Sequence, residues 1–231
     1  MTAPRPIFLH GAIAGSSCWG SLSDRFDGAA VLGLPGHPAG GAISDVSELV
    51  DRIALAITRL DGSRVAVGHG LGALLALETA RRHPDVLAGV VALGVAARLR
   101  VPQVAGTTHD DTVSELLAAS LHEPVGDVGE ALAQAMQALG AEALATDLAM
   151  AARLEIGTRA REIRCPVLVV VGEHDVWAPP LEAAELAAAL PNSRMIVVAQ
   201  AGHLVQADAP ATTQLLIAAF LARLELTLVD E

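Results

Sequence analysis

The sequence predicts an α/β protein built on a doubly wound, mostly parallel sheet of about six strands, with a small helical insertion. Short apolar runs alternate with stretches of helical period along most of the chain, as expected for a parallel sheet covered by helices. The runs are bounded by Gly or Pro and lie at 7–9, 29–32, 65–67, 87–93, 166–171 and 195–198. Because they are nearly continuous in apolar residues, we expect strands covered on both faces.

Helical periodicity is clear between these runs. An apolar stripe extends over 46–60, and Asp45 with Glu48 three residues later resembles a capping box at its start. A second helix is expected over 71–82, because Pro84 disfavours its continuation. Further helices are expected over 181–190, before Pro191, and over 215–224.

The segment 97–164 interrupts this alternation. It has no strand candidate, but helical patterns lie near 112–121, 128–139 and 142–154. We therefore expect a core made of 1–96 and 165–231, with 97–164 inserted as a helical lid. Two interpretations stay open: a lid over a pocket at the strand ends, or the ordinary packing helices of a parallel crossover.

Composition restricts the class of protein. Of 231 residues, 52% are apolar and 18% are charged, which excludes a disordered chain. The formal charge of −11 argues against nucleic acid or an anionic membrane as partner. Cys18 and Cys165 are too few for a disulfide framework and fit a reducing compartment. The first residues run almost directly into a strand, leaving no room for a signal peptide. We expect a cytoplasmic protein that binds a small molecule, as a monomer or homodimer.

Gly68-His69-Gly70-Leu71-Gly72 carries the most informative pattern in the chain. It follows a strand and opens a helix, which is the context of the nucleophile elbow, Gly-x-Ser-x-Gly. Gly70 stands at the position of the serine. A dinucleotide-binding loop is disfavoured, because Gly-x-Gly-x-x-Gly would need glycine where Ala73 stands and no ribose-binding acid ends a following strand.

An acid and a histidine follow the elbow along the chain. Gly172-Glu173-His174-Asp175 comes after the strongest strand, and Ala201-Gly202-His203 after the last one. The order elbow, acid, histidine is that of the α/β-hydrolase fold. The chain resembles the α/β-hydrolase superfamily, closest to its small esterase, lactonase and C–C hydrolase branch. Besides these motifs, the resemblance rests on His10-Gly11, Trp19 and Leu34-Pro35-Gly36-His37, so that it spans nearly the whole chain.

The resemblance implies roles for particular residues. His203 would be the general base, and Asp175 would orient its imidazole. The amides of Ala12 and Leu71 would form an oxyanion hole. Because its donors are backbone groups, this hole should persist without the serine. The alternatives that stay open are a turn-capping role for Asp175 and a surface-loop position for His203. The residues expected at the substrate are His10, Gly11 and Trp177, with a core or rim position equally open for Trp177.

The other histidines show no metal-ligand spacing. We expect them on loops or at the surface, and we expect no metal site and no cofactor; they are His37, His69, His83, His109, His122 and His174. Ser16, Ser17 and Cys18 could be considered as replacement nucleophiles. A helix start capped by serine is the favoured interpretation, because these residues lie at the wrong point of the chain to meet His203.

Gly70 leaves three functions open. In the first, the chain is a hydrolase of a small, apolar ester, lactone or diketone whose serine was replaced, by drift or by deliberate mutation. In the second, His203 and Asp175 act without a serine, as a general-base dyad of the lyase or cofactor-free oxygenase type. In the third, the chain binds a ligand without catalysis. Fold alone does not choose among these three functions. We rank the hydrolase lineage first, the dyad enzyme second and the binder third.

Overall fold

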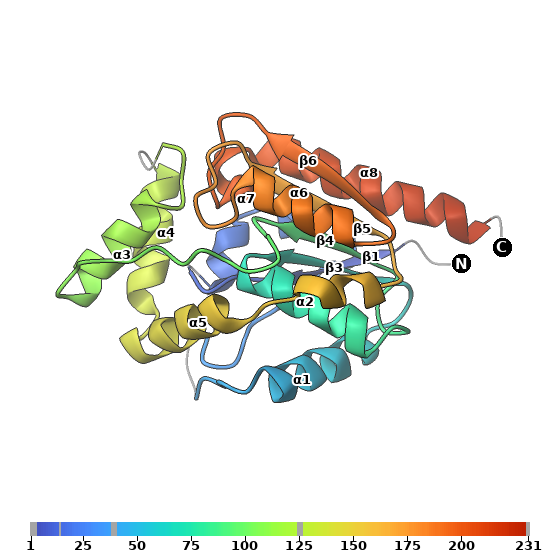
Figure 1. Ribbon diagram of the computed structural model, residues 1–231, viewed down its shortest axis with the longest axis horizontal. Helices are drawn as coiled ribbons and strands as arrows, with labels where there is room; N and C mark the ends of the chain where they lie inside the picture. Colours follow the sequence, from blue (N-terminus) through green and yellow to red (C-terminus); the bar gives the residue numbers. More distant parts are fainter. Residues whose placement is uncertain (1–3, 14, 38–40, 124–126, 230–231) are drawn as a thin grey trace.

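The computed structural model describes residues 4–13, 15–37, 41–123 and 127–229. Met1, Thr2 and Ala3, at the N-terminus considered above, lie outside this part. Six parallel strands form one sheet in the order β2-β1-β3-β4-β5-β6 (Figure 1). The predicted α/β class and parallel sheet are therefore confirmed. The strands are β1 (Arg5–Leu9), β2 (Ala30–Leu32), β3 (Arg64–His69), β4 (Gly89–Leu93), β5 (Val167–Gly172) and β6 (Ser193–Val198).

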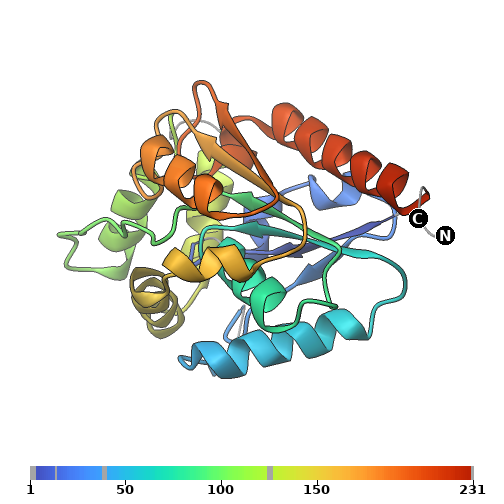
Figure 2. The same ribbon diagram turned by 45° about the vertical axis from the view of Figure 1, so that its right-hand side comes forward.

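Side chains of the central strands alternate between two hydrophobic cores. Along β4, Val90 and Ala92 face one core, while Val91 and Leu93 face the other. This alternation follows from the two-residue period of a strand, and it explains the continuous apolar runs. The first core also contains α1 (Val46–Thr58), α2 (Leu71–Arg82) and α6 (Pro180–Ala189); the second contains α7 (Val205–Asp208) and α8 (Pro210–Val229). Figure 2 shows α1 and α8 on opposite sides of the sheet.

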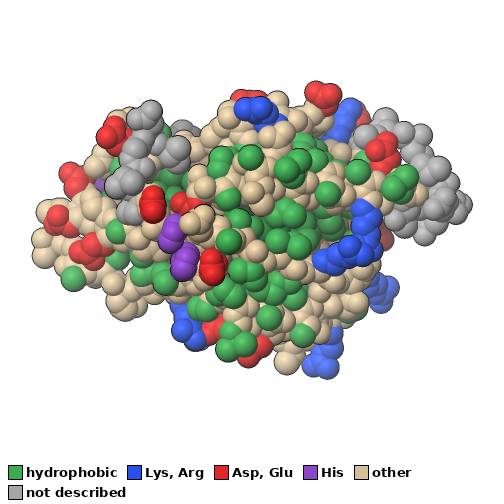
Figure 3. Space-filling model, turned by 90° about the horizontal axis from the view of Figure 1, so that it is seen from above, with side chains coloured by type: hydrophobic (Ala, Val, Ile, Leu, Met, Phe, Trp, Pro, Cys, Tyr) green, Lys and Arg blue, Asp and Glu red, His purple; other side chains and the backbone are tan. Residues whose placement is uncertain are grey.

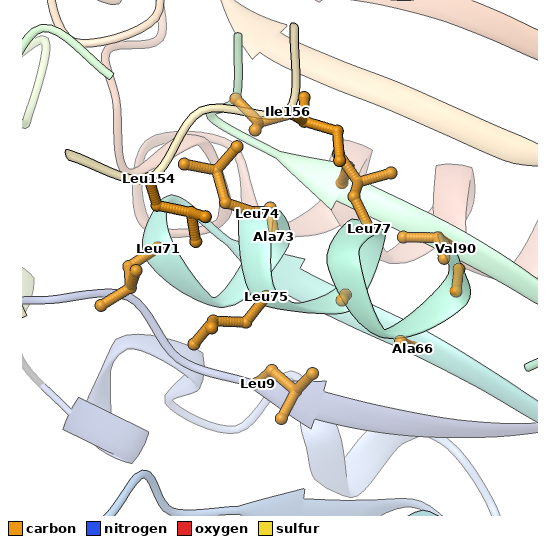
Figure 4. Packing of buried hydrophobic residues seen from close by; sticks show 14 of the residues in the cluster. Leu9, Ala66, Leu71, Ala73, Leu74, Leu75, Leu77, Val90, Leu154 and Ile156 are labelled. Atoms are coloured by element: carbon orange, nitrogen blue, oxygen red, sulfur yellow. The ribbon is translucent and has the colours of Figure 1, made fainter. Parts of the chain in front are cut away.

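Helix α2 is the most deeply buried of the helices that pack in the first core. Its leucines pack on the sheet and on the chain that leaves the insertion, and Figure 4 shows Leu71 and Leu74 beside Leu154. At the start of α1, Asp45 accepts from the amide of Glu48 at 2.9 Å. The Glu48 carboxylate bonds Arg52 instead of returning to the cap, so only half of the predicted capping box forms.

The segment between β4 and β5 is helical. It contains α3 (His109–Ala118), α4 (Asp127–Ala138), α5 (Ala141–Arg153) and the 3-10 helix η3 (Gly157–Glu162). A capping box at Thr108 and Asp111 begins α3. An antiparallel bridge between Arg98 and Glu155 brings the two ends of the helical part together. In Figure 1, α3, α4 and α5 lie beside the sheet, beyond the carboxyl ends of its strands.

The two edge strands differ from the expectation of strands covered on both faces. β2 and β6 each have one unpaired side in the described sheet, and the side chains of Val31, Ile196 and Val197 are exposed. Figure 3 shows hydrophobic side chains at the surface across the middle of the face that contains β6. An apolar run alone does not separate a central strand from an edge strand, which is why the prediction was wrong here.

None of the helices in the described part of the chain combines the length and the apolar character that crossing a membrane requires.

Replacing Gly72 with Ala should destabilise the fold by about 3 kcal/mol, because the new methyl group would meet backbone. A Cβ at Gly72 would lie 2.3 Å from the carbonyl oxygen of Leu9 and 2.4 Å from that of His10. The free energy of unfolding is measured by urea denaturation. Gly140→Ala is the matched control, since no atom of the described residues lies within 4 Å of its added Cβ. Equal stability of the two variants would contradict this packing.

Candidate active site

Gly70 lies at the tip of a sharp turn between β3 and α2. Its backbone has φ 53° and ψ −115°, a conformation that strains any residue with a Cβ. The flanking glycines are required by close packing: a Cβ at Gly68 would lie 2.5 Å from the carbonyl oxygen of Gly72. The amide of Gly70 donates to the carbonyl of Leu93 at 2.9 Å, which ties the turn to the end of β4. The turn therefore has the geometry of an elbow with no side chain at its tip.

His203 faces Gly70 across the carboxyl edge of the sheet. An ideal Cβ at Gly70 would lie 3.2 Å from Nε2 of His203. On the other side of the ring, Nδ1 lies 3.1 Å from each carboxylate oxygen of Asp175. All three residues are buried. The structure thus brings together the elbow, the histidine and the acid, which are up to 133 positions apart in the sequence, in the order that proton transfer requires.

Backbone amides hold Asp175 in place. Its Oδ1 accepts from the amides of Trp177 at 2.9 Å and Ala178 at 2.8 Å. With Nδ1 of His203, three nitrogen atoms surround this one carboxylate. The turn after β5 therefore presents a fixed acceptor to the imidazole of His203.

The indole of Trp177 stacks on His203. The ring centroids are 4.7 Å apart and the planes are 4° from parallel. Trp177 is buried, so of the positions left open for this residue the structure shows the core one, in direct contact with the imidazole. Together with Asp175, it restricts the ring of His203 to one orientation.

His69 was expected on a loop or at the surface, and that prediction was wrong. It is the last residue of β3 and is fully buried, with Nε2 donating to the carbonyl oxygen of His203 at 3.0 Å. Burial, and then the nearby His203, hold the pKa of His69 well below its usual range, so the ring is neutral. The signal in the sequence was its place at the end of a buried strand.

The two expected oxyanion donors lie at neighbouring strand ends. Leu71 is the first residue of α2, where amides have no partner within the helix. Ala12 lies in the turn after β1 and is buried. Since Leu9 of β1 pairs with Gly68 of β3, both residues lie at the same edge of the sheet as Gly70. Gly11 packs on His69, whose Nδ1 would lie 2.8 Å from a Cβ at that position.

His10 connects two loops and offers no free polar atom to a ligand. Its Nε2 accepts from the amide of Leu34 at 2.9 Å, and its Nδ1 lies 2.8 Å from the carbonyl oxygen of Gly11. Desolvation by burial lowers the pKa of His10 to about 4. The neutral ring therefore fixes the loop after β1 against the loop after β2. This arrangement places His10 beside the site as a support for Gly11 and Ala12.

His37 is also buried, contrary to expectation. Its side chain is 2% exposed, and its Nε2 lies 2.6 Å from the carboxylate of Asp147 in α5. The pair connects the loop after β2 to the helical insertion, and 110 positions separate the partners, so no local pattern predicts it. His83, His109, His122 and His174 are partly or fully exposed, in line with their expected loop or surface positions.

The loop that carries His203 is also fixed from the insertion. Asp208 accepts from the amide of Gly202 at 2.7 Å and from that of His122 at 3.0 Å. The amide of Leu204 donates to the carbonyl of Ser120 at 2.8 Å. The end of α3 is therefore part of the support of this loop.

Cys18 is not a replacement nucleophile. It lies in the 3-10 helix η1 (Gly15–Trp19), and burial raises the pKa of its thiol to about 12. A thiol with this pKa is protonated at neutral pH, and the thiolate is the nucleophilic form. Ser16 and Ser17 of the same short helix are exposed.

The surface has three hollows of about 730, 490 and 560 Å³, and the third is lined in part by Ser17 and Cys18. None of the three is lined by Gly70, Asp175 or His203. The largest lies between α1, α5 and η3, and its walls carry both charges, for example Glu78 and Arg159. Within the described residues, no group of three or more His, Cys, Asp or Glu side chains is placed to hold a metal ion.

The low pKa of His10 predicts that the protein loses stability in acid. Above pH 6.5 the imidazole of His10 is neutral in both the folded and the unfolded state. Between pH 6.5 and about pH 4 it binds a proton in the unfolded state but stays neutral in the folded state. Stability should fall by about 3 kcal/mol across this window. Urea denaturation as a function of pH measures the effect, and His10→Gln should reduce it, leaving the part of the acid sensitivity that comes from the lowered pKa of His69. Identical pH profiles for the two proteins would contradict the assignment.

Known proteins resemble this chain over most of its length. Residues 7–213 match the alpha/beta hydrolase family. The chain is 26% identical over 234 residues to a pimeloyl-acyl-carrier-protein methyl ester esterase of Aromatoleum aromaticum, covering 88% of this chain and 92% of that protein. It is 27% identical over 245 residues to a 2-(acetamidomethylene)succinate hydrolase of Mesorhizobium japonicum, covering 92% of this chain and 86% of that protein.

Solved structures share the fold. A malate-bound esterase from Thermogutta terrifontis aligns with a TM-score of 0.80 and 23% identity, over 97% of this chain and 91% of that chain. The enol-lactonase from Burkholderia xenovorans aligns with a TM-score of 0.82 and 20% identity, over 96% and 92%. Since the family match covers most of the sequence and the sheet has the matching architecture, the chain belongs to the alpha/beta hydrolase family and is a hydrolase by lineage.

Proposed function

We propose that this chain carries the active site of a hydrolase for small, apolar esters, lactones or diketones, in which Gly70 replaces the serine nucleophile. The observation that carries the proposal is the position of His203, whose Nε2 lies 3.2 Å from the point where a Cβ at Gly70 would stand. In this position the imidazole can reach the hydroxyl of a serine at residue 70. Esterase and hydrolase relatives support the same class of reaction.

With a serine at the tip, each residue has a chemical task. The hydroxyl oxygen attacks the substrate carbonyl while His203 takes its proton, and Asp175 stabilises the imidazolium that forms. The amides of Ala12 and Leu71 hold the developing oxyanion. His203 then returns the proton to the leaving alcohol, and water releases the acyl group by the same steps. With Gly70, the covalent route is absent and the acid, the base and the oxyanion donors remain.

Contacts of the helical insertion 97–164 with the site support a role as a lid. Leu99, at its start, lies 4.0 Å from the Cβ position of Gly70, and His37 bonds Asp147 of α5. Gly70 and His203 are buried, and Ser120 of the same segment accepts from the amide of Leu204, next to His203. We infer that the insertion covers the site and supplies the apolar wall of the substrate pocket.

Restoring the hydroxyl should create an esterase. We expect Gly70→Ser to hydrolyse short p-nitrophenyl esters at a rate on the order of 10²-fold or more above the unchanged chain. It should also react with a fluorophosphonate probe. The same variant should be less stable by about 1–3 kcal/mol, because serine has to adopt the positive φ that glycine tolerates. Release of p-nitrophenol and urea denaturation measure the two effects.

Two matched variants identify the source of that activity. Gly70→Ala adds the same strained Cβ without a hydroxyl, and should lose stability without gaining hydrolysis. Adding His203→Ala to Gly70→Ser should remove the gain, because the serine then has no base. A folded Gly70→Ser protein that is inert towards every ester and towards the probe would overturn the proposal.

A second function is favoured by the intact Asp175–His203 pair beside an unsubstituted Cα. In this alternative His203 removes a proton from a substrate, or from water, without any serine. It predicts an activity of the unchanged chain that His203→Ala abolishes and that Gly70→Ser does not improve. A ligand that stabilises the unchanged chain and His203→Ala equally would instead indicate binding without catalysis.

A further inference from the structure

We propose that Leu99 sets the length of the acyl group that this site accepts. The inference rests on the proposed function and extends it to the substrate. Two atoms of His203 lie nearest to the Cβ position of Gly70, at 3.2 Å and 3.6 Å, and Cδ1 of Leu99 follows at 4.0 Å. Leu99 is thus the first side chain beyond the general base that faces the reacting position.

The stereochemistry of acyl transfer gives Leu99 a defined neighbour. Besides the attacking oxygen, the tetrahedral intermediate has three substituents: the oxyanion, the leaving group and the acyl chain. The oxyanion lies towards the amides of Ala12 and Leu71, and the leaving oxygen has to lie near Nε2 of His203 to receive a proton. The acyl chain takes the remaining direction, on the side that Leu99 closes.

The backbone around Leu99 is fixed, so this wall does not swing away freely. Before it, the carbonyl of Ala97 accepts from the amide of Ile156 at 2.9 Å, and Arg98 pairs with Glu155. After it, the amide of Arg100 donates to the carbonyl of Trp177 at 2.7 Å. Trp177 stacks on His203, which couples the wall to the base itself.

The surroundings of Leu99 are apolar. Leu99 is buried in the same hydrophobic core as Leu71, Leu154 and Ile156, and Figure 4 shows Leu71 and Leu154 close together at the start of α2. Apart from its chain neighbours, the described side chains within 4 Å of the Cβ position of Gly70 are those of His203 and Leu99. The chemical class that fits is a short, unbranched, uncharged acyl chain.

The test uses the Gly70→Ser protein and p-nitrophenyl acetate, butyrate and hexanoate, which differ only in acyl length. Adding Leu99→Ala should raise the ratio of kcat/KM for hexanoate to that for acetate by about tenfold or more, because room for additional methylenes opens. Leu99→Val, which disturbs packing less, should change the ratio in the same direction by a smaller factor.

Two controls separate specificity from stability. Leu87→Ala truncates another buried leucine, which lies just before the amino end of β4, whereas the site lies at the carboxyl ends of the strands. This variant should leave the hexanoate-to-acetate ratio of kcat/KM unchanged. Acetate esters of longer alcohols should also keep their relative rates in Leu99→Ala. An unchanged acyl ratio, or a change confined to the alcohol series, would overturn the role of Leu99.

A binding series tests Leu99 without any nucleophile. The unchanged chain and its Leu99→Ala variant are titrated calorimetrically with straight-chain carboxylates from acetate to octanoate, the acid products of such esters. The carboxylate that binds most tightly should be longer for Leu99→Ala, and equal optima would contradict the inference. Inactivity of Gly70→Ser towards all esters would overturn the proposed function alone, since the binding series judges Leu99 independently.

Discussion

Close backbone packing at the turn between β3 and α2 is the constraint on which the site depends. The start of α2 lies directly on the end of β1, so closely that a Cβ at Gly72 would approach the Leu9 carbonyl to 2.3 Å. Gly68 is equally restricted by the backbone of the helix that follows. This contact bends the chain and leaves Gly70 at the tip with φ 53°. The position of the amide of Leu71 beside the end of β1 follows from the same contact.

The loop of His203 is held from several elements at once. His69 of β3 binds its carbonyl, Asp175 after β5 binds its ring, and Asp208 binds the amide of the preceding glycine. Gly94, after β4, leaves room for it, since a Cβ there would lie 2.8 Å from the His203 carbonyl. Ser120 adds a contact from the insertion. The turn after α3 therefore helps to hold the loop that carries His203.

The sequence was sufficient for the architecture and for the residues that meet at Gly70. Buried parallel strands and the glycines at their ends leave strong local patterns, so each of the six strands and the span of α2 could be predicted. The exposure of side chains on an edge strand, such as Val197, could not be predicted, because strand order is set by pairing between distant segments. The pair His37–Asp147 and the wall at Leu99 also lay beyond prediction, since they depend on how the insertion docks on the core.

The two residues of the dyad differ in what their presence implies about chemistry. Asp175 accepts two backbone hydrogen bonds within its own turn, so it would stabilise the fold even in a protein without activity. The imidazole of His203 has one polar contact to that acid, and its other nitrogen faces the tip of the elbow. Burying an imidazole in this orientation offers little to stability that an apolar ring stacked on Trp177 would not also provide. His203, rather than Asp175, is therefore the residue whose orientation argues that this site was built for proton transfer.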